Sequence, residues 1–518
     1  MQKIIIDPVT RIEGHLKVEV TVENGEVKQA STSGTLFRGW EIILRGRDPR
    51  DASQLTQRVC GVCPAVHATA SVFALDNAFG VENDIPENAR IIRNLILGAN
   101  FLQSHILHFY HLASLDFFDV TAVSDYQGND PDLISVKKFL ERGVLFPFVP
   151  RYEGDYRLDN QTNKEFAAHY IKALEVRKKC HEMLAIFGGK MPHSVGMVAG
   201  GVTEKPTPDK IISFLGKLNS VKDFIDNFYL PDTLKLVKFY ADLLQEGVSY
   251  NNFLSYGAFN LDSEEFDQTK RNRLFLQGVV SEKQYRQLEI EKIFEDVKYS
   301  WYEENTSALH PSRGKTVPKP GKENGYSWLK SPRYDKMPCE VGPAARLIVG
   351  YYGGNKVIRE AVESILSYID GEPLNLASTL GRHIARALDA KIVAENMVKW
   401  VTSLKPDQPV YTPCSVPQET EGVGITDGPR GALGHWIKVK DSVIENYQLV
   451  VPTTWNASPK DDQGKPGPME RALLGLKVKD PENPFEIVRC VRSFDPCLAC
   501  AVHLVTPKKR KISTLRIV

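Results

Sequence analysis

Apolar and polar residues alternate strictly near the start of the chain. Residues 16–21 read LKVEVT, so every second side chain is apolar. A period of two is typical of a strand with one buried face. Asn24 and Gly25 then form a turn signal, and apolar residues resume at Val27. The pattern predicts a small antiparallel sheet at the N-terminus.

Long stretches with helical periodicity follow this sheet. The stretch after Pro86 continues to about residue 109 without another proline, and it is apolar on more than one face. A helix of that kind belongs inside a bundle, because a surface helix would keep one polar face. Similar patterns and end signals predict further helices over residues 64–79, 163–187, 343–369 and 378–404, and one that begins at Thr207 and Pro208.

Two regions have weaker periodicity. Between residues 251 and 338, Gly, Pro, Asn and aromatic residues are mixed, and irregular loops with short helices are expected. After Pro406 the chain is rich in turn residues, with short strands expected around residues 436–439 and 448–451. The predicted fold class is mainly α (α+β), with a long-helix bundle core and small peripheral β-sheets formed near both termini.

The composition is that of an ordinary globular protein with a sizeable core. The chain has 518 residues, 42% of them hydrophobic and 25% charged, and its formal net charge is +1. This balance argues against a nucleic-acid-binding surface. No apolar run is long enough to cross a membrane, and the N-terminus is too polar for a secretory signal. A partner with its own signal would still be able to carry the chain across a membrane.

Four of the eight cysteines fall into two C-x-x-C pairs. In the first pair, Cys60 and Cys63 are one helical turn apart, and Pro64 suits the first turn of a following helix. Cys63 is therefore expected at a helix N-terminus, where the helix dipole and the nearby Arg58 favour the thiolate that metals bind. The remaining cysteines are expected to be buried small hydrophobic residues, and they are Cys180, Cys339, Cys414 and Cys490.

The second pair, Cys497 and Cys500, lies close to the C-terminus and is followed by His503. Two such pairs make a four-thiolate site, which suits structural zinc or an iron–sulfur cluster as well as a redox metal. The large separation argues against zinc, because zinc ribbons place their pairs ~15–20 residues apart. The spacing of the cysteines alone does not identify the metal.

Other motifs in the sequence narrow the choice of metal. The cysteine pairs read R-x-C-G-x-C-x-x-x-H and D-P-C-x-x-C-x-x-H, and together with the other motifs the sequence resembles the nickel–iron hydrogenase large (catalytic) subunit. The other motifs, in the order of that family, are residues 7–15 (DPVTRIEGH), 37–41 (FRGWE), 45–50 (RGRDPR), 340–346 (EVGPAAR), 428–436 (GPRGALGHW) and 451–456 (VPTTWN).

The resemblance implies an oxidoreductase that cleaves dihydrogen reversibly and heterolytically into protons and electrons. It implies nickel bound by four cysteines, with Cys60 and Cys497 terminal and Cys63 and Cys500 bridging to an iron. That iron carries carbon monoxide and cyanide ligands. The chain has no cysteines left in a cluster-binding arrangement. An iron–sulfur small subunit is therefore expected as the partner that takes the electrons.

The resemblance also implies catalytic residues. Cys497 matches the first proton acceptor, Glu13 the glutamate that takes the proton onward, and Arg430 the arginine held above the metals. Simpler explanations are that Glu13 is a surface carboxylate at a strand end, and that Arg430 forms only a buried ion pair with Asp495.

Other residues are implied at the cofactor. Pro429 and Asp495 accompany Arg430, Thr453 matches the hydroxyl that hydrogen-bonds a cyanide, and His67 is a candidate for orienting a bridging thiolate. One departure concerns Ser104. Many members have an aspartate there, and this stretch is more like the selenium-containing branch, although Cys497 is an ordinary cysteine.

A second metal site and a maturation step follow from the same resemblance. Glu41, His503 and the backbone carbonyl of Leu449 match a magnesium or iron site. A maturation endopeptidase, acting after nickel-insertion factors, is expected to cut directly after His503. This leaves residues 1–503 as a single domain and removes the extension 504–518.

Location and role remain expectations from the resemblance. The chain resembles uptake-type members that are exported with the small subunit. It is therefore expected in the periplasm or at the periplasmic face of the membrane, which it would contact only through partners. A hydrogen-sensing homologue is the main alternative role. A zinc-stabilised scaffold without enzymatic activity is the alternative from another class.

Overall fold

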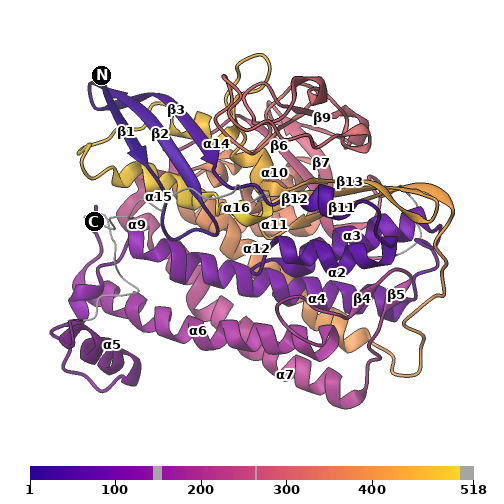
Figure 1. The fold of residues 1–518 in the computed structure, drawn as a ribbon. Coiled ribbons are helices and arrows are strands. Elements are labelled where there is room, and N and C mark those ends of the chain that lie inside the picture. The colour runs from indigo at the N-terminus through magenta and orange to yellow at the C-terminus, as the bar shows by residue number, and fades with distance from the viewer. Residues whose placement is uncertain (144–153, 263–264, 266, 502–518) are drawn as a thin grey trace.

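Four long helices pack into a bundle in the computed structural model, which describes residues 1–143, 154–262, 265 and 267–501, without the side chains of residues 500 and 501. They are α4 (Glu87–Ile106), α6 (Asn160–Gly188), α7 (Pro208–Phe224) and α12 (Thr379–Ser403). Helix α4 packs between α6 and α12, and α7 packs against both α6 and α12 (Figure 1). The predicted helical bundle is confirmed.

The surroundings of helix α4 explain why its sequence pattern has no polar face. Every residue from Asn88 to Ile106 is buried, since neighbouring helices cover all sides. Helix α6 begins where the side chain of Asp159 accepts a hydrogen bond from the amide of Thr162. Thr207 does precede α7 as predicted, but its side chain makes no capping hydrogen bond.

The N-terminal sheet is also confirmed. Strands β1 (Gln2–Ile6), β2 (Leu16–Glu23) and β3 (Glu26–Gly34) pair antiparallel in that order. Along β2 buried and half-exposed side chains alternate, as the pattern predicted.

The prediction of irregular loops over residues 251–338 is wrong. This region contains the antiparallel sheet β6 (Asn252–Asn260), β7 (Arg273–Ser281) and β8 (Gln284–Arg286). Nearly every residue of β6 is buried, so both of its faces are covered and the alternation that identifies a strand is lost. A second pair, β9 (Ile293–Asp296) with β10 (Ser331–Tyr334), follows.

The C-terminal sheet is larger than predicted. Strands β11 (Glu419–Gly428), β12 (Gly431–Lys440) and β13 (Val443–Val450) form it, and β11 was not expected at all. Strand β11 was not predicted because it contains glycines, which allow the strand to approach a helix closely. A Cβ atom on Gly424 would lie 2.0 Å from the carbonyl oxygen of Ala70.

The predicted helix over residues 343–369 is two helices, α10 (Pro343–Tyr352) and α11 (Lys356–Ile369). The chain breaks between them at Gly353 and Gly354, and Asn355 caps α11. The other short elements are α1 (Trp40–Ile43), α2 (Ala52–Thr56), α5 (Pro131–Glu141), α8 (Leu230–Lys235), α9 (Val237–Tyr240), α13 (Pro452–Asn456), α14 (Pro468–Leu473), α15 (Phe485–Ser493), α16 (Leu498–Ala501), β4 (Met197–Val198) and β5 (Gly201–Val202).

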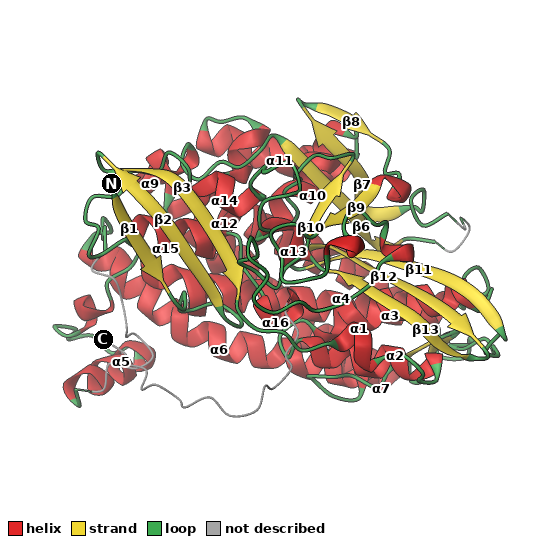
Figure 2. Cartoon of the chain, turned by 45° about the horizontal axis from the view of Figure 1, so that its top comes forward, coloured by secondary structure: helices red, strands yellow, loops and turns green. Residues whose placement is uncertain are grey.

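The N-terminal and C-terminal sheets lie at opposite ends of the molecule (Figure 2). Helix α3 (Pro64–Ala78) packs against β11 and β12, and α16 packs against α13 near the centre. Within the described ranges, no helix has both the length and the apolar character needed to cross a bilayer. Of the four scattered cysteines, Cys414 alone is partly exposed, and the others are buried as predicted.

Candidate metal centre

Three cysteines from the two ends of the chain meet at one buried point. Cys63 is the N-cap residue of α3, Cys60 lies just before it, and Cys497 lies just before α16. The sulfur of Cys497 is 3.4 Å from that of Cys60 and 4.0 Å from that of Cys63. All three are buried, and their sulfur atoms lie within 4.8 Å of one another. The side chain of Cys500 and all of His503 lie outside the described residues.

The chemistry of this donor set fits a metal bound by thiolates. The closest of these sulfur pairs is far beyond the ~2.05 Å of a disulfide bond. The amides of Val62 and Cys63 lie 3.2 Å and 3.5 Å from the sulfur of Cys60, where they favour a negative charge. Soft thiolates at this spacing suit nickel and iron.

Glu13 lies directly beside the terminal thiol that the sequence singled out. Its Oε2 atom accepts hydrogen bonds from Cys497 Sγ at 3.1 Å and from the amide of Ala499 at 2.9 Å. Burial, together with the charge of Cys60, raises the pKa of Glu13 to about 7. The glutamate is therefore not a surface carboxylate, and its pKa suits proton exchange near neutral pH.

The backbone holds Glu13 in this place. Its carbonyl oxygen accepts from the amide of Leu498 at 2.8 Å, so the N-terminal segment and the Cys497 segment form a short parallel bridge. Gly14 has a φ of 80°, and a Cβ atom there would lie 2.7 Å from the amide nitrogen of Ala499. Only glycine allows this close approach.

Arg430 lies in the hairpin turn between β11 and β12 and points at the same centre. Its Nη2 donates to Asp495 Oδ1 at 2.9 Å, and its Nη1 donates to Ser104 Oγ at 3.2 Å. Burial lowers the pKa of Arg430, but the charges of Asp495 and the cysteines outweigh burial and raise it well above its usual value. The predicted ion pair is present, with a hydroxyl in place of a second carboxylate.

A small cavity joins the cysteines to the remaining predicted cofactor residues. It is lined by Cys63, His67, Pro429, Arg430, Thr453 and Cys497, among others. The hydroxyl oxygen of Thr453 accepts from the amide of Cys497 at 2.9 Å, so its proton stays available to another acceptor. Of the predicted cofactor residues, His67, Pro429, Arg430 and Thr453 therefore line one space, and Asp495 contacts Arg430 beside it.

The sequence motifs did not predict the series of polar contacts that begins at His67. His67 Nδ1 lies 3.3 Å from His435 Nε2, and His435 Nδ1 lies 2.9 Å from the Tyr447 hydroxyl oxygen. Tyr447 contacts the hydroxyl of Ser71 at 3.2 Å. His435 lies in one of the quoted motifs, but its neighbours in space come from other elements.

The predicted second metal site is partly described. Glu41 on α1 accepts from the amide of Leu449 at 2.9 Å and also contacts the Thr316 hydroxyl. Strand β13 is an edge strand, and a residue's N–H and C=O point to the same edge in an antiparallel pair. The carbonyl of Leu449 therefore faces the same side as Glu41. No local pattern predicts Lys330, which is buried beside this site and contacts Glu295 and Gln448, both at 3.1 Å.

Comparison with known proteins agrees with this centre. A family model described as nickel-dependent hydrogenase matches residues 38–503, and a second model, described as HoxL-like, matches residues 3–33. The chain belongs to the nickel-dependent hydrogenase family.

Relatives of this hydrogenase cover its whole length. It is 43% identical to the periplasmic [NiFeSe] hydrogenase large subunit of Desulfomicrobium baculatum, over 97% of this chain and 95% of the relative. It is 37% identical to the quinone-reactive Ni/Fe-hydrogenase large chain of Wolinella succinogenes, over 100% and 98%. The solved Ni-Fe-Se hydrogenase of Desulfovibrio vulgaris Hildenborough matches with a TM-score of 0.86 at 44% identity, covering 97% of this chain and 100% of that one. The likeness to the selenium-containing branch is confirmed.

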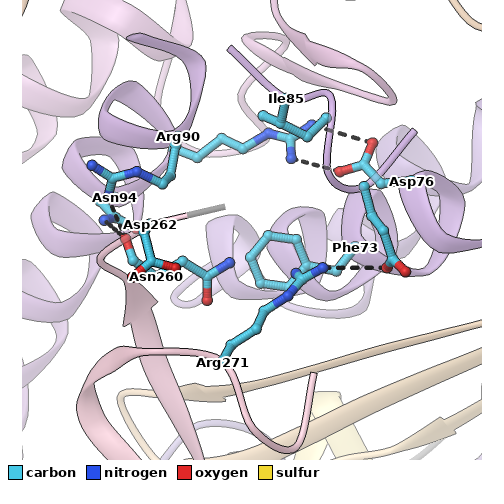
Figure 3. Close-up of a pocket in the computed structure, with 10 residues that line it drawn as sticks. Phe73, Asp76, Ile85, Arg90, Asn94, Asn260, Asp262 and Arg271 are labelled. Carbon is cyan, nitrogen blue, oxygen red and sulfur yellow. Dashed lines mark hydrogen bonds and ion pairs between the residues drawn. The ribbon is translucent and has the colours of Figure 1, made fainter. Parts of the chain in front are cut away.

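A second polar cavity of this hydrogenase lies away from the cysteines, near the end of α3 (Figure 3). Arg93 donates to Asp76 at 2.6 Å, and Arg271 donates to Glu82 at 3.3 Å. Arginines and carboxylates neutralise one another here, so the cluster fits a structural ion-pair network.

Proposed function

We propose that the chain is the catalytic large subunit of a nickel–iron hydrogenase, which cleaves dihydrogen reversibly and heterolytically into protons and electrons. The observation that carries this proposal is the Glu13 carboxylate at 3.1 Å from Cys497 Sγ, within a centre of buried thiols. A structural zinc site needs no such buried carboxylate with a pKa near neutrality.

The residues fit a nickel–iron cofactor. Cys60, Cys63, Cys497 and Cys500 would hold the nickel, with Cys63 and Cys500 shared with an iron that carries carbon monoxide and cyanide. When bound, this group supplies the redox chemistry by which dihydrogen is split. Thr453 has a hydroxyl proton free for an acceptor in the cavity, which suits a cyanide ligand.

The protein's own contribution is proton transfer and a fixed electrostatic environment. Cys497 Sγ receives the proton and passes it to Glu13 Oε2 along their hydrogen bond. Arg430, locked by Asp495 and Ser104, presents a permanent positive charge in a site shielded from water. Such a preorganised charge acts more strongly in a buried site than in water.

Glu41, the Leu449 carbonyl and His503 would hold magnesium or iron as a second metal site. Glu41 and the edge of β13 that carries Leu449 already lie side by side. Oxygen ligands of this type, completed by one imidazole, suit a hard divalent cation.

Metal analysis and hydrogen turnover test the function directly. We expect about one nickel per chain, as the ligand set implies, and dihydrogen-dependent reduction of a dye by the purified complex. Zinc without nickel, and no turnover, would support the zinc-stabilised scaffold.

A heterodimer located outside the cytoplasm is expected. Within the described residues, Cys60, Cys63 and Cys497 are the only group of three or more metal-binding side chains close enough to hold one metal ion, so an electron path needs a partner. An affinity tag on this chain should therefore recover an iron–sulfur small subunit from the periplasmic fraction. A fully active chain without a partner, or activity confined to the cytoplasm, would contradict this.

The mature chain is expected to end at His503. Cys497 is buried, and a tail from Leu504 would bring the basic residues 508–511 towards that interior, at several kcal/mol for each buried charge. Cleavage by an endopeptidase after nickel insertion would let the segment close and leave residues 1–503 as a single domain. Intact-mass measurement of the active enzyme checks this, and full activity with Val518 still attached would refute it.

A further inference from the structure

A single buried carboxylate joins the two segments that carry the proton-transfer pair. Asp116 follows the helical extension of α4 and is only 1% exposed. Its Oδ1 atom accepts from Arg492 Nη1 at 2.6 Å and also from Arg11 Nη2. Its Oδ2 atom has no hydrogen-bond partner among the described residues. Both guanidinium groups therefore contact the same carboxylate oxygen.

The two arginines belong to different segments. Arg11 lies two residues before Glu13, and its Nη1 also donates to the carbonyl of Leu112 at 2.9 Å. Arg492 lies on α15, five residues before Cys497. Arg492 also donates to the carbonyl and the hydroxyl of Thr10, at 3.0 Å and 3.1 Å. The segments that precede Glu13 and Cys497 are thus joined directly by Arg492 and Thr10, and also through Asp116.

The geometry of this cluster makes Asp116 hard to replace. Arg11 has a φ of 57°, a left-handed conformation that L-residues rarely adopt without support. Removing one partner of a buried ion pair is strongly destabilising, and here one carboxylate contacts two cations. Without Asp116, Arg11 would keep its contact with Leu112 and Arg492 its contacts with Thr10, but the carboxylate that joins the two arginines would be lost.

We propose that Asp116 is a positioning residue that sets the separation of Cys497 Sγ and Glu13 Oε2. The inference rests on the proposed function. In the step concerned, the S–H bond of Cys497 breaks and an O–H bond forms on Glu13. A displacement of about 1 Å at a reacting pair costs roughly a hundredfold in rate. The direct bridge at Leu498 holds the backbones together at Glu13 itself, whereas Asp116 contacts Arg11 and Arg492, which precede the two partners in sequence.

The test uses the purified heterodimer and compares D116N with D76N. Asp76 is an equally buried carboxylate paired with Arg93, in the cavity of Figure 3. The readouts are nickel per chain, melting temperature, and the rate of isotope exchange between D2 and water per nickel. We expect at least a tenfold fall in exchange for D116N and less than a twofold change for D76N, with a larger solvent isotope effect on hydrogen oxidation in D116N.

A milder variant covers the case in which D116N fails to assemble. R11K keeps the positive charge, but a single ammonium group cannot reproduce the paired contacts with Asp116 and Leu112. Its exchange rate per nickel is expected to fall at least threefold. Equal rates per nickel for D116N and D76N, or an unchanged rate in R11K, would overturn the inference. A wild-type heterodimer with neither nickel nor exchange would instead overturn the proposed function, and the inference with it.

Discussion

Replacing Glu13 with glutamine is expected to lower hydrogen turnover by at least about a hundredfold while nickel content stays normal. The amide has the size of the carboxyl and can still accept from Ala499, so the bridge to the Cys497 segment is retained. It cannot take up the proton that Cys497 delivers. Turnover with a dye acceptor, together with metal analysis of the same sample, measures both quantities.

A matched control exists in Glu470. Burial raises its pKa to about 7 as well, and its carboxylate accepts from Thr32 and Tyr326, away from the cysteines. E470Q should retain turnover close to that of the wild type, because it removes a similar buried carboxyl without touching the proton path. Wild-type turnover in E13Q would show that the proton leaves by another path.

Replacing Cys60 with serine is expected to reduce nickel to below about a tenth of the wild-type content, and turnover with it. A hydroxyl is a harder and much less acidic ligand than a thiol, and nickel bound among thiolates depends on soft donors. The amides of Val62 and Cys63 that now face the sulfur would lose the charge they support. Elemental analysis of the purified complex gives the result.

Cys180 provides the control for that substitution. It is fully buried on α6, far from the pairs in sequence, and burial raises the pKa of its thiol. C180S should cost some stability but leave nickel content unchanged. Normal nickel in C60S would remove Cys60 from the ligand set, whereas loss of nickel in both variants would point to general misfolding.

The elements that were predicted correctly are those whose sequence signals are local. Pro64 after Cys63 placed a thiol at a helix N-terminus, and the structure has Cys63 as the N-cap of α3. The alternation along β2 and the long apolar stretch of α4 were correct for the same reason. Periodicity and capping act between residues a few positions apart, so they can be recognised without knowing the fold.

The order of the motifs also selected most residues of the candidate centre. Glu13, Arg430 and Cys497 were chosen from separate motifs. The structure places Glu13 within hydrogen-bond distance of Cys497, and Arg430 lines the same cavity as Cys497. The motifs could not show that burial raises the pKa of Glu13 to about 7, because desolvation depends on every segment packed around the carboxylate.

The remaining features depend on tertiary packing and could not be predicted from local patterns. Strand β6 is buried on both faces, and β11 has glycines that allow helix α3 to pack closely against it. Neither strand therefore shows the alternation of apolar and polar residues by which a strand is recognised. Asp116 likewise has no local signal, since its two arginines lie 105 and 376 positions away. Contacts of this range are set by how helices and sheets pack, and a carboxylate gains its role from neighbours that no local pattern can identify.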